Sequence, residues 1–283
     1  MQRQGSIVYL GREGDEKTCL GLKAVVEDGW TVVLAIGYSP PPGGVVKRKR
    51  TLYERIVAGL ASAIRALSPL RTIARTARRM LGLKRTRKQA GARYLKMSEI
   101  CEAKGISYCE TSDKTLASLR DQISLLNPDV ILGNGWEFKI TADIFSLARL
   151  VPLNCHSSYL PEYRGGNVTL AVLINEETQS GVTVHEMVED FDAGRILAQQ
   201  RVNVARDETR ESLRSKRARV TGSVLAEALE IAGQEARYKD NPASPFYYRC
   251  DFSTYLRYKR INRFRKLLGL PIKRYEPDQR PGH

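Results

Sequence analysis

The chain has 283 residues, of which 42% are hydrophobic and 27% charged, so it can build a core and is not disordered as a whole. Lysine and arginine number 46 against 31 aspartate and glutamate, which gives a net charge of +15. The stretch from Lys47 to Arg93 holds 15 bases and one acid, Glu54, and so carries +14 of that total. The remainder is close to neutral, which disfavours a protein that binds nucleic acid over its whole surface.

Membrane-spanning and secreted proteins are disfavoured as well. No window approaches 18 uninterrupted apolar residues, and the first residues lack the basic-then-apolar layout of a secretion signal. The five cysteines are odd in number and form no CxxC pair, which favours reduced thiols over a disulfide framework. We therefore expect a cytoplasmic protein, with the inner face of the membrane as an alternative location. With three histidines in the chain, we expect no metal site.

Apolar, β-branched runs alternate with helical patterns along most of the chain. The expected strands are 6–10, 31–36, 106–109, 128–132, 151–154, 181–187 and 195–204. The expected helices are 17–27, 114–126, 142–150 and 207–236, the last with Asp207 or Thr209 as its N-cap. This alternation predicts an α/β fold with a Rossmann-like, mostly parallel sheet flanked by helices. Such sheets bind ligands beyond the carboxyl ends of their strands.

A basic segment interrupts this pattern between about residues 45 and 95. Its apolar residues recur at helical spacing, at Leu52, Ile56, Leu60, Ile64 and Leu67. It is interpreted as a helical insertion packed on the body, as an amphipathic helix on an anionic membrane surface, or as an arm on RNA. RNA is the least favoured, because the segment has few aromatic residues for base stacking. We expect a catalytic domain over 1–236 that includes the insertion, then a Tyr- and Arg-rich extension over 237–283.

The residues best suited to chemistry follow two expected strands. Asn154 ends one strand and His156 lies two positions on, so both side chains point to the same side of an extended chain. Asp192 precedes an Ala-Gly turn after a later strand. An Asn N–H and a protonated His both donate to a developing oxyanion, and a nearby carboxylate would raise the pKa of that His above about 6.5. The same pair would relay a proton from an attacking amine.

Other side chains near this group are expected to play no chemical part. Cys155 points away from its neighbours and is interpreted as buried filler, which leaves no nucleophile and favours direct group transfer. His185 lies in mid-strand and is expected to be a packed or surface histidine. An Asn and a His after a strand could also serve only to bond a loop. The length of the ordered pattern over 154–166 and 181–194 argues for function.

These two stretches resemble the folate-dependent formyltransferases, which include glycinamide-ribonucleotide, methionyl-tRNA and amino-sugar N-formyltransferases. The resemblance covers about residues 130–236 and implies a catalytic trio of Asn154, His156 and Asp192. It also implies N10-formyltetrahydrofolate as the formyl donor and an amine as the acceptor. The pteridine would lie between two loops, which contribute Gly133, Gly135, Trp136 and Phe138, and Val188, Glu189 and Asp190. Trp136 and Phe138 either wall the flat ring or only close the end of the sheet.

We therefore expect an N-formyltransferase that acts on a nucleotide- or lipid-linked amino sugar in cell-surface glycan synthesis, through a tetrahedral intermediate. About 45 residues follow the core, too few for the barrel domain of the resembling tRNA formyltransferases. The basic segment, 47–93, suits an anionic acceptor or an anionic membrane surface. The alternatives are formylation of methionyl-tRNA and a non-catalytic, membrane-associated binding module on the same fold. The sequence leaves the oligomeric state open.

Overall fold

The computed structural model describes residues 5–41, 96–242, 246–276 and 278–279. The described residues from 5 to 39 and from 96 onward belong to one compact unit. The expected basic insertion and its helices lie outside the described residues. None of the helices within the described ranges is long and apolar enough to cross a bilayer.

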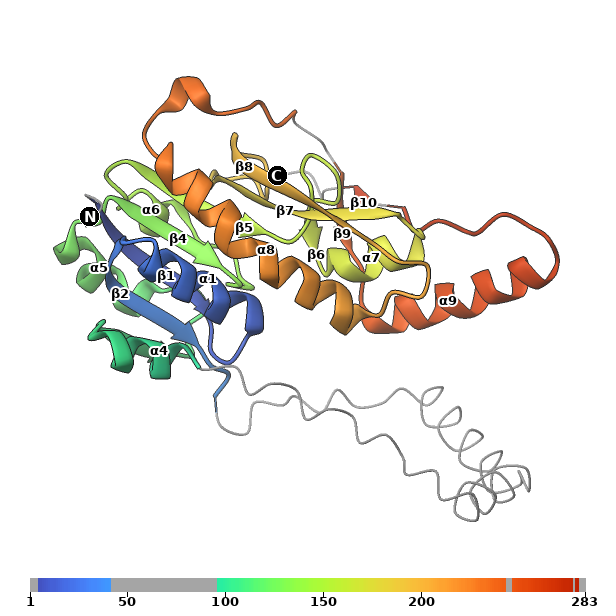
Figure 1. Cartoon of the computed structure of the whole chain (residues 1–283), viewed down its shortest axis with the longest axis horizontal. Helices are drawn as coiled ribbons and strands as arrows, with labels where there is room; N and C mark the ends of the chain where they lie inside the picture. The colour runs from blue at the N-terminus through green and yellow to red at the C-terminus, as the bar shows by residue number, and fades with distance from the viewer. Residues whose placement is uncertain (1–4, 42–95, 243–245, 277, 280–283) are drawn as a thin grey trace, which may run out of the picture. The chain divides into compact units, whose positions relative to one another are not determined.

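A seven-stranded sheet forms the centre of this unit, with the strand order β3-β2-β1-β4-β5-β7-β8 (Figure 1). The first five strands in this order run parallel, whereas β7 pairs antiparallel with both β5 and β8. The strands are β1 (Ser6–Arg12), β2 (Thr31–Tyr38), β3 (Tyr108–Thr111), β4 (Val130–Asn134), β5 (Val151–His156), β7 (Gln179–Glu186) and β8 (Ile196–Asn203). The predicted α/β fold with a mostly parallel sheet is confirmed.

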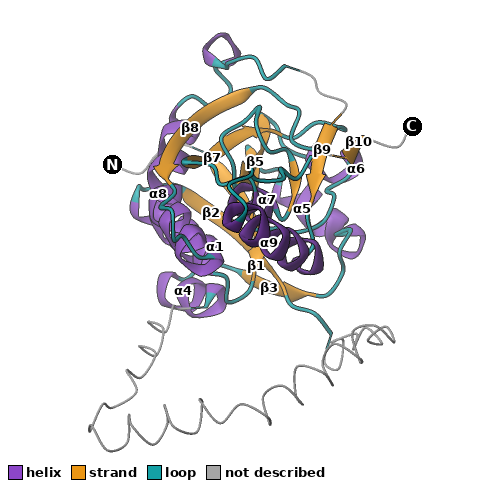
Figure 2. Ribbon diagram, turned by 90° about the vertical axis from the view of Figure 1, so that its right-hand side faces the viewer, coloured by secondary structure: helices purple, strands orange, loops and turns teal. Residues whose placement is uncertain are grey.

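Helices cover both faces of the sheet (Figure 2). One face carries α1 (Glu16–Glu27), α4 (Met97–Lys104) and α8 (Arg210–Glu230), and the other carries α5 (Arg120–Leu126) and α6 (Ala142–Phe145). Side chains of β1 alternate between the two cores: Ile7 and Tyr9 pack on the first side, Val8 and Leu10 on the second. Burial on both faces explains why the parallel strands read as continuous apolar runs in the sequence.

The C-terminal part packs on the body through a second, smaller sheet and a helix pair. β9 (Phe246–Arg249) pairs with β6 (Gly165–Gly166) on one side and with β10 (Asp278–Gln279) on the other. Helix α9 (Phe252–Leu267) contacts α7 (Val168–Ile174). Tyrosines gather around buried Leu170 and Ile174 of α7, namely Tyr163, Tyr248, Tyr255, Tyr258 and Tyr275.

Several helices are shorter than the sequence predicts, and hydrogen bonds explain where they begin or end. Before α5, backbone N–H groups of Thr115 and Ser118 donate to the Asp113 carboxylate and hold a turn, followed by a 3-10 helix over Ala117–Leu119. Helix α6 stops early because Leu150 donates its N–H to Asp129 O, which draws the chain into β5. Thr209 is the N-cap of α8, since its side chain accepts from the Ser212 N–H.

Candidate active site

Two polar side chains project from the end of β5 into a cavity. Asn154 and His156 lie on one side of the strand, and Cys155 lies on the other, where it joins the core with Leu153. The expected alternation is therefore present, and β5 extends two residues further than predicted. Strand β5 lies between β4 and the antiparallel β7. Its carboxyl end lies at the edge of the sheet where α/β folds bind ligands.

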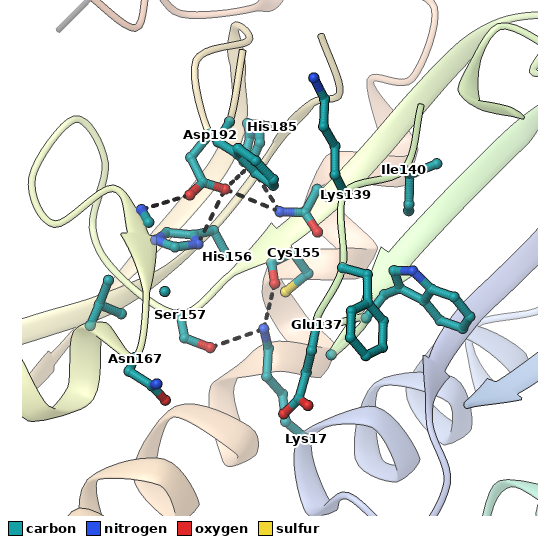
Figure 3. A pocket seen from close by; sticks show the side chains of 18 of the residues that line it. Lys17, Glu137, Lys139, Ile140, Cys155, His156, Ser157, Asn167, His185 and Asp192 are labelled. Atoms are coloured by element: carbon teal, nitrogen blue, oxygen red, sulfur yellow. Dashed lines mark hydrogen bonds and ion pairs between the residues drawn. The ribbon is translucent and has the colours of Figure 1, made fainter. Parts of the chain in front are cut away.

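The turn after β7 brings Asp192 to the same place (Figure 3). Its Oδ1 atom lies 3.3 Å from Nδ1 of His156 and 3.5 Å from Nδ2 of Asn154. His156 is 8% and Asp192 9% exposed, so this contact is largely shielded from water. The three residues that the sequence singled out, from two stretches far apart in the chain, thus form one cluster.

His185 is a fourth member of this cluster that the sequence did not reveal. It is 2% exposed, and its Nε2 atom lies 3.1 Å from Asn154 Nδ2 and 3.4 Å from Asp192 Oδ1. Its Nδ1 atom lies 2.6 Å from the carbonyl oxygen of Glu186, to which only an N–H can donate. Both ring nitrogens are engaged, so the ring orientation is fixed. His185 is opposite Asn154 in the β5–β7 ladder, a register that the sequence alone does not give.

Backbone contacts hold the Asp192 carboxylate in place. Gly165 donates its N–H to Oδ2 over 2.9 Å. Gly165 has φ +103°, and a Cβ there would come within 2.3 Å of the Tyr248 carbonyl oxygen, so this approach requires glycine. Asp192 itself has φ +52°, a left-handed conformation that Asp tolerates better than most residues.

The turn that carries Asp192 is fixed by a residue from the C-terminal part of the chain. Asn241 donates through Nδ2 to the carbonyl oxygens of Asp192, over 3.0 Å, and of Gly194, over 2.8 Å. Its own Oδ1 accepts from Nη2 of Arg164, which is buried. Arg164 lies in the ordered pattern over 154–166 but was given no role, and Asn241 did not stand out, because only the fold brings their partners near.

Burial governs the charge state of His156. Desolvation lowers its pKa below the usual value, and the attraction of Asp192, which acts in the opposite sense, is the smaller effect. Asp192 acts in the expected direction, but the expectation that the pKa of His156 would lie above about 6.5 is wrong, because it left out the cost of burying the imidazolium. For Asp192, burial acts to raise the pKa, but His156, His185 and the Gly165 N–H outweigh it and hold the pKa well below its usual value.

The cluster forms one wall of a cavity of about 680 Å³, within the range typical of small-molecule sites. Six of the seven residues implied for the pteridine line it, namely Gly135, Trp136, Phe138, Val188, Glu189 and Asp190. Gly133 does not line the cavity; it lies in β4 behind the side chain of Asn154.

The aromatic residues of the first loop differ in how far they are available to a ligand. Trp136 is buried and packs edge-on against Tyr38 and Phe138, so it mainly closes the end of the sheet. Phe138 is only partly buried. On the opposite loop, Val188 and Phe191 are exposed, so an apolar surface remains for a flat ring.

Another part of the cavity wall is basic, which the sequence analysis also missed. Lys17 at the start of α1 donates to the Cys155 carbonyl oxygen over 2.5 Å and to Ser157 Oγ over 3.2 Å. Arg217 of α8 is 1% exposed and donates to the Ser157 carbonyl oxygen and to Thr169 Oγ1. Burial lowers the pKa of Arg217 to about 9. Among the described residues, neither cation has a carboxylate partner.

The chain is similar to known proteins both in sequence and in fold. Residues 71–229 match the family model described as formyl transferase. Glycinamide ribonucleotide transformylase 1 from Symbiobacterium toebii has a TM-score of 0.56 and 15% identity, over 84% of this chain and 95% of that one. Phosphoribosylglycinamide formyltransferase from Anaplasma phagocytophilum has a TM-score of 0.55 and 16% identity, over 82% and 89%. At identities this low, the likeness to these two structures shows a shared fold and nothing more.

Proposed function

Because the chain belongs to the formyl transferase family, we propose that it moves a formyl group from N10-formyltetrahydrofolate to a primary amine on a nucleotide- or lipid-linked amino sugar. The family match makes the protein a formyltransferase, and we propose the identity of its formyl donor and the class of its acceptor. The observation that carries it is the convergence of Asn154, His156 and His185 on one carboxylate oxygen of Asp192 at the wall of a large cavity.

The donor fits the cavity in two respects. The volume of the cavity is sufficient for a substituted bicyclic ring, and Phe138, Val188 and Phe191 offer apolar surface on two sides. A flat heterocycle between these loops would bring its side-chain nitrogen toward the end of β5. The donor supplies an activated formyl group, and the residues of the chain supply orientation and charge stabilisation.

The proposed reaction is an attack of the acceptor nitrogen on the formyl carbon. The carbonyl oxygen becomes an oxyanion, which accepts hydrogen bonds from Asn154 Nδ2 and from Nδ1 of His156 once that ring is protonated, because Nε2 of His156 already donates to the Tyr163 carbonyl oxygen over 3.0 Å. Both groups now reach Asp192 only over 3.3–3.5 Å, longer than a good hydrogen bond, so an oxyanion can compete for them. Asp192 takes the proton from the amine, through water, and shares it with Nδ1 of His156; N10 receives this proton as the bond from the formyl carbon to N10 breaks and the oxyanion becomes a carbonyl again.

The basic wall supports an anionic acceptor. Arg217 and Lys17 lie beside the catalytic cluster, and both contact Ser157, the residue that follows His156. The N-terminus of α1, a ready site for an anion, is already taken by Asp15, whose carboxylate accepts from the Thr18 N–H. A phosphate-bearing acceptor is therefore expected to use the two side chains.

The test is to incubate the protein with N10-formyltetrahydrofolate and a panel of nucleotide-linked and lipid-linked amino sugars, and to follow tetrahydrofolate release together with the mass of the acceptor. We expect release with at least one amino sugar and none with the matching sugar that lacks the amine. The Asp192→Asn protein is the control. Release with aminoacyl-tRNA alone would instead support the RNA reading, and no release with any amino sugar would overturn the proposed acceptor.

A further inference from the structure

Helix α9 points its large apolar side chains away from the protein. Tyr255, Tyr258 and Asn262 face inward, and Asn262 is 4% exposed. The outward residues are Phe252, Leu256, Phe264 and Leu267, between 51% and 78% exposed, followed by the exposed Leu268 and Leu270. A surface helix normally shows the reverse arrangement, with its apolar stripe on the core and its polar side in water.

This orientation is fixed by specific contacts. Asn262 donates through Nδ2 to the Lys273 carbonyl oxygen over 3.1 Å, and its Oδ1 accepts from the Lys273 N–H over 2.7 Å. Lys266 forms an ion pair of 2.6 Å with Glu176, at the end of α7. Turning the helix to hide the phenylalanines and leucines would break these bonds, so their exposure is part of the folded structure.

The same segment is strongly basic. From Phe252 to Tyr275 the chain has eight lysines and arginines and no acid. Arg260 lies in the exposed row between Leu256 and Phe264, and Arg263 lies beside it. Within the part of the chain that the structure describes, these two arginines have no carboxylate partner. The outer face of α9 thus combines uncompensated positive charge with exposed aliphatic and aromatic side chains.

We propose that the outer face of α9 docks the protein on an anionic lipid bilayer. Its apolar side chains would enter the boundary between headgroups and acyl chains, and Arg260 and Arg263 would contact lipid phosphates, as in other interfacial helices. RNA fits less well, because four of the six exposed apolar residues on this face are leucines, which offer no platform for base stacking. A second copy of the chain fits less well too, because two such faces repel each other.

The proposed surface lies close to the cavity along the chain. Arg249, which lines the cavity, is three residues before Phe252, the first residue of α9. A bilayer bound at α9 would therefore lie near one wall of the active site, where a lipid-linked acceptor would be presented. The docking itself does not depend on which acceptor is used, so it is testable without one.

The test uses the full chain and vesicles of phosphatidylcholine, alone or mixed with phosphatidylglycerol, in a co-sedimentation assay. We expect binding only to the anionic vesicles. The variant Leu256→Gln/Leu267→Gln should bind at least about a hundredfold more weakly, since two apolar side chains no longer leave water. The matched control is Leu125→Gln/Leu150→Gln, which changes two exposed leucines outside α9 and should bind like the wild type.

The contribution of positive charge to vesicle binding is tested with Arg260→Gln/Arg263→Gln, and Arg120→Gln/Arg237→Gln is the control. At about fivefold per cation, the first pair should weaken vesicle binding roughly 25-fold, and the second should leave it unchanged. Thermal melts check that each variant is folded. If single-stranded RNA binds the wild type more tightly than anionic vesicles do, the proposal is overturned in favour of nucleic acid.

Tryptophan fluorescence distinguishes lipid contact by α9 from lipid contact by the basic segment over 47–93. In Leu267→Trp, the added indole should show a blue-shifted emission with anionic vesicles and quenching by brominated lipid, relative to the wild-type background of Trp30 and Trp136. Wild-type vesicle binding by both glutamine variants of α9, or no change in the added emission, would overturn the proposal.

Discussion

Nε2 of His185 lies 3.4 Å from Oδ1 of Asp192, almost as near as the 3.3 Å that separates this oxygen from Nδ1 of His156. The carboxylate is therefore placed between two imidazole rings, whose centroids are 6.4 Å apart and whose planes are tilted by 72°. Nε2 of His185 accepts from the Asn154 amide, whose nitrogen can only donate, so His185 orients the amide and packs against the acid of the cluster.

Replacing His185 should lower turnover through the Asn154 amide that it orients. In His185→Leu the Asn154 amide loses its neighbour and can rotate, and a displacement of this size can cost up to about 10²-fold in rate. We expect kcat to fall and the KM for the folate donor to change little. His185→Gln, whose amide can still face Asn154, should recover part of the loss. A wild-type kcat in His185→Leu would rule out this positioning role.

The residues assigned to the reaction itself should behave differently from His185. His156→Ala and Asp192→Asn should each lower kcat by about 10²–10³-fold, because their contacts matter mainly in the transition state. Asn154→Ala should be similarly severe. Folate binding should survive in all three, measured as the rise in melting temperature with added folate. Near-normal turnover in His156→Ala would refute its assigned part in the reaction.

Asn241→Ala tests the support of the Asp192 turn. The substitution removes two hydrogen bonds to backbone carbonyls and leaves Nη2 of the buried Arg164 without its side-chain acceptor, so the free energy of unfolding should fall by about 1–3 kcal/mol. The turnover number should fall as well, because Asp192 is no longer held. The control is Asn203→Ala, at an exposed position. If both variants show the same stability and kcat, the turn is held by other contacts.

The lowered pKa of His156 predicts a pH dependence of stability. In the unfolded chain this imidazole binds a proton near pH 6.5, while in the folded state it stays neutral to lower pH. Below about pH 6.5 the unfolded state therefore binds more protons, and the free energy of unfolding falls by at most about 1.4 kcal/mol per pH unit from this group. The loss ends once the pH passes the folded pKa.

Urea unfolding between about pH 7.5 and pH 5.5 measures this effect, and His156→Gln should show a shallower slope than the wild type. Asp192 does not interfere, because its unfolded-state pKa near 3.9 lies below this window. Equal slopes in the two proteins would show that the burial of His156 does not control its protonation.

The sequence was sufficient for the fold class and for the common side of Asn154 and His156, because both depend on local periodicity, whereas their meeting with Asp192 was implied by the family resemblance. The apolar runs of β1 and β4 indicate strands buried on both faces. The i, i+2 spacing of Asn154 and His156 places them on one side of β5. The Ala-Gly pair that follows Asp192 predicts that this residue lies in a loop, as it does. Each inference needs only the geometry of one strand or one turn.

The rest of the site depends on pairings between distant segments. His185 reaches Asn154 through the antiparallel register of β7 on β5, and Arg217 reaches Ser157 from α8. The pKa of His156 depends on the amount of protein that surrounds it, a property of the whole fold. The inward turn of Asn262 in α9 likewise follows from contacts with Lys273 and α7, whereas the sequence of this helix shows apolar residues on every side.

The bond from Asn241 to the backbone of Asp192 spans 49 residues and has a bearing on how the protein is made. During synthesis, β5, β7 and β8 emerge and can pair before the segment that contains Asn241 leaves the ribosome. A nascent chain stopped after α8 would hold every strand of the central sheet, yet the turn that carries the acid would still lack its anchor. Catalytic competence is therefore expected to arise late in translation, after most of the chain has already folded.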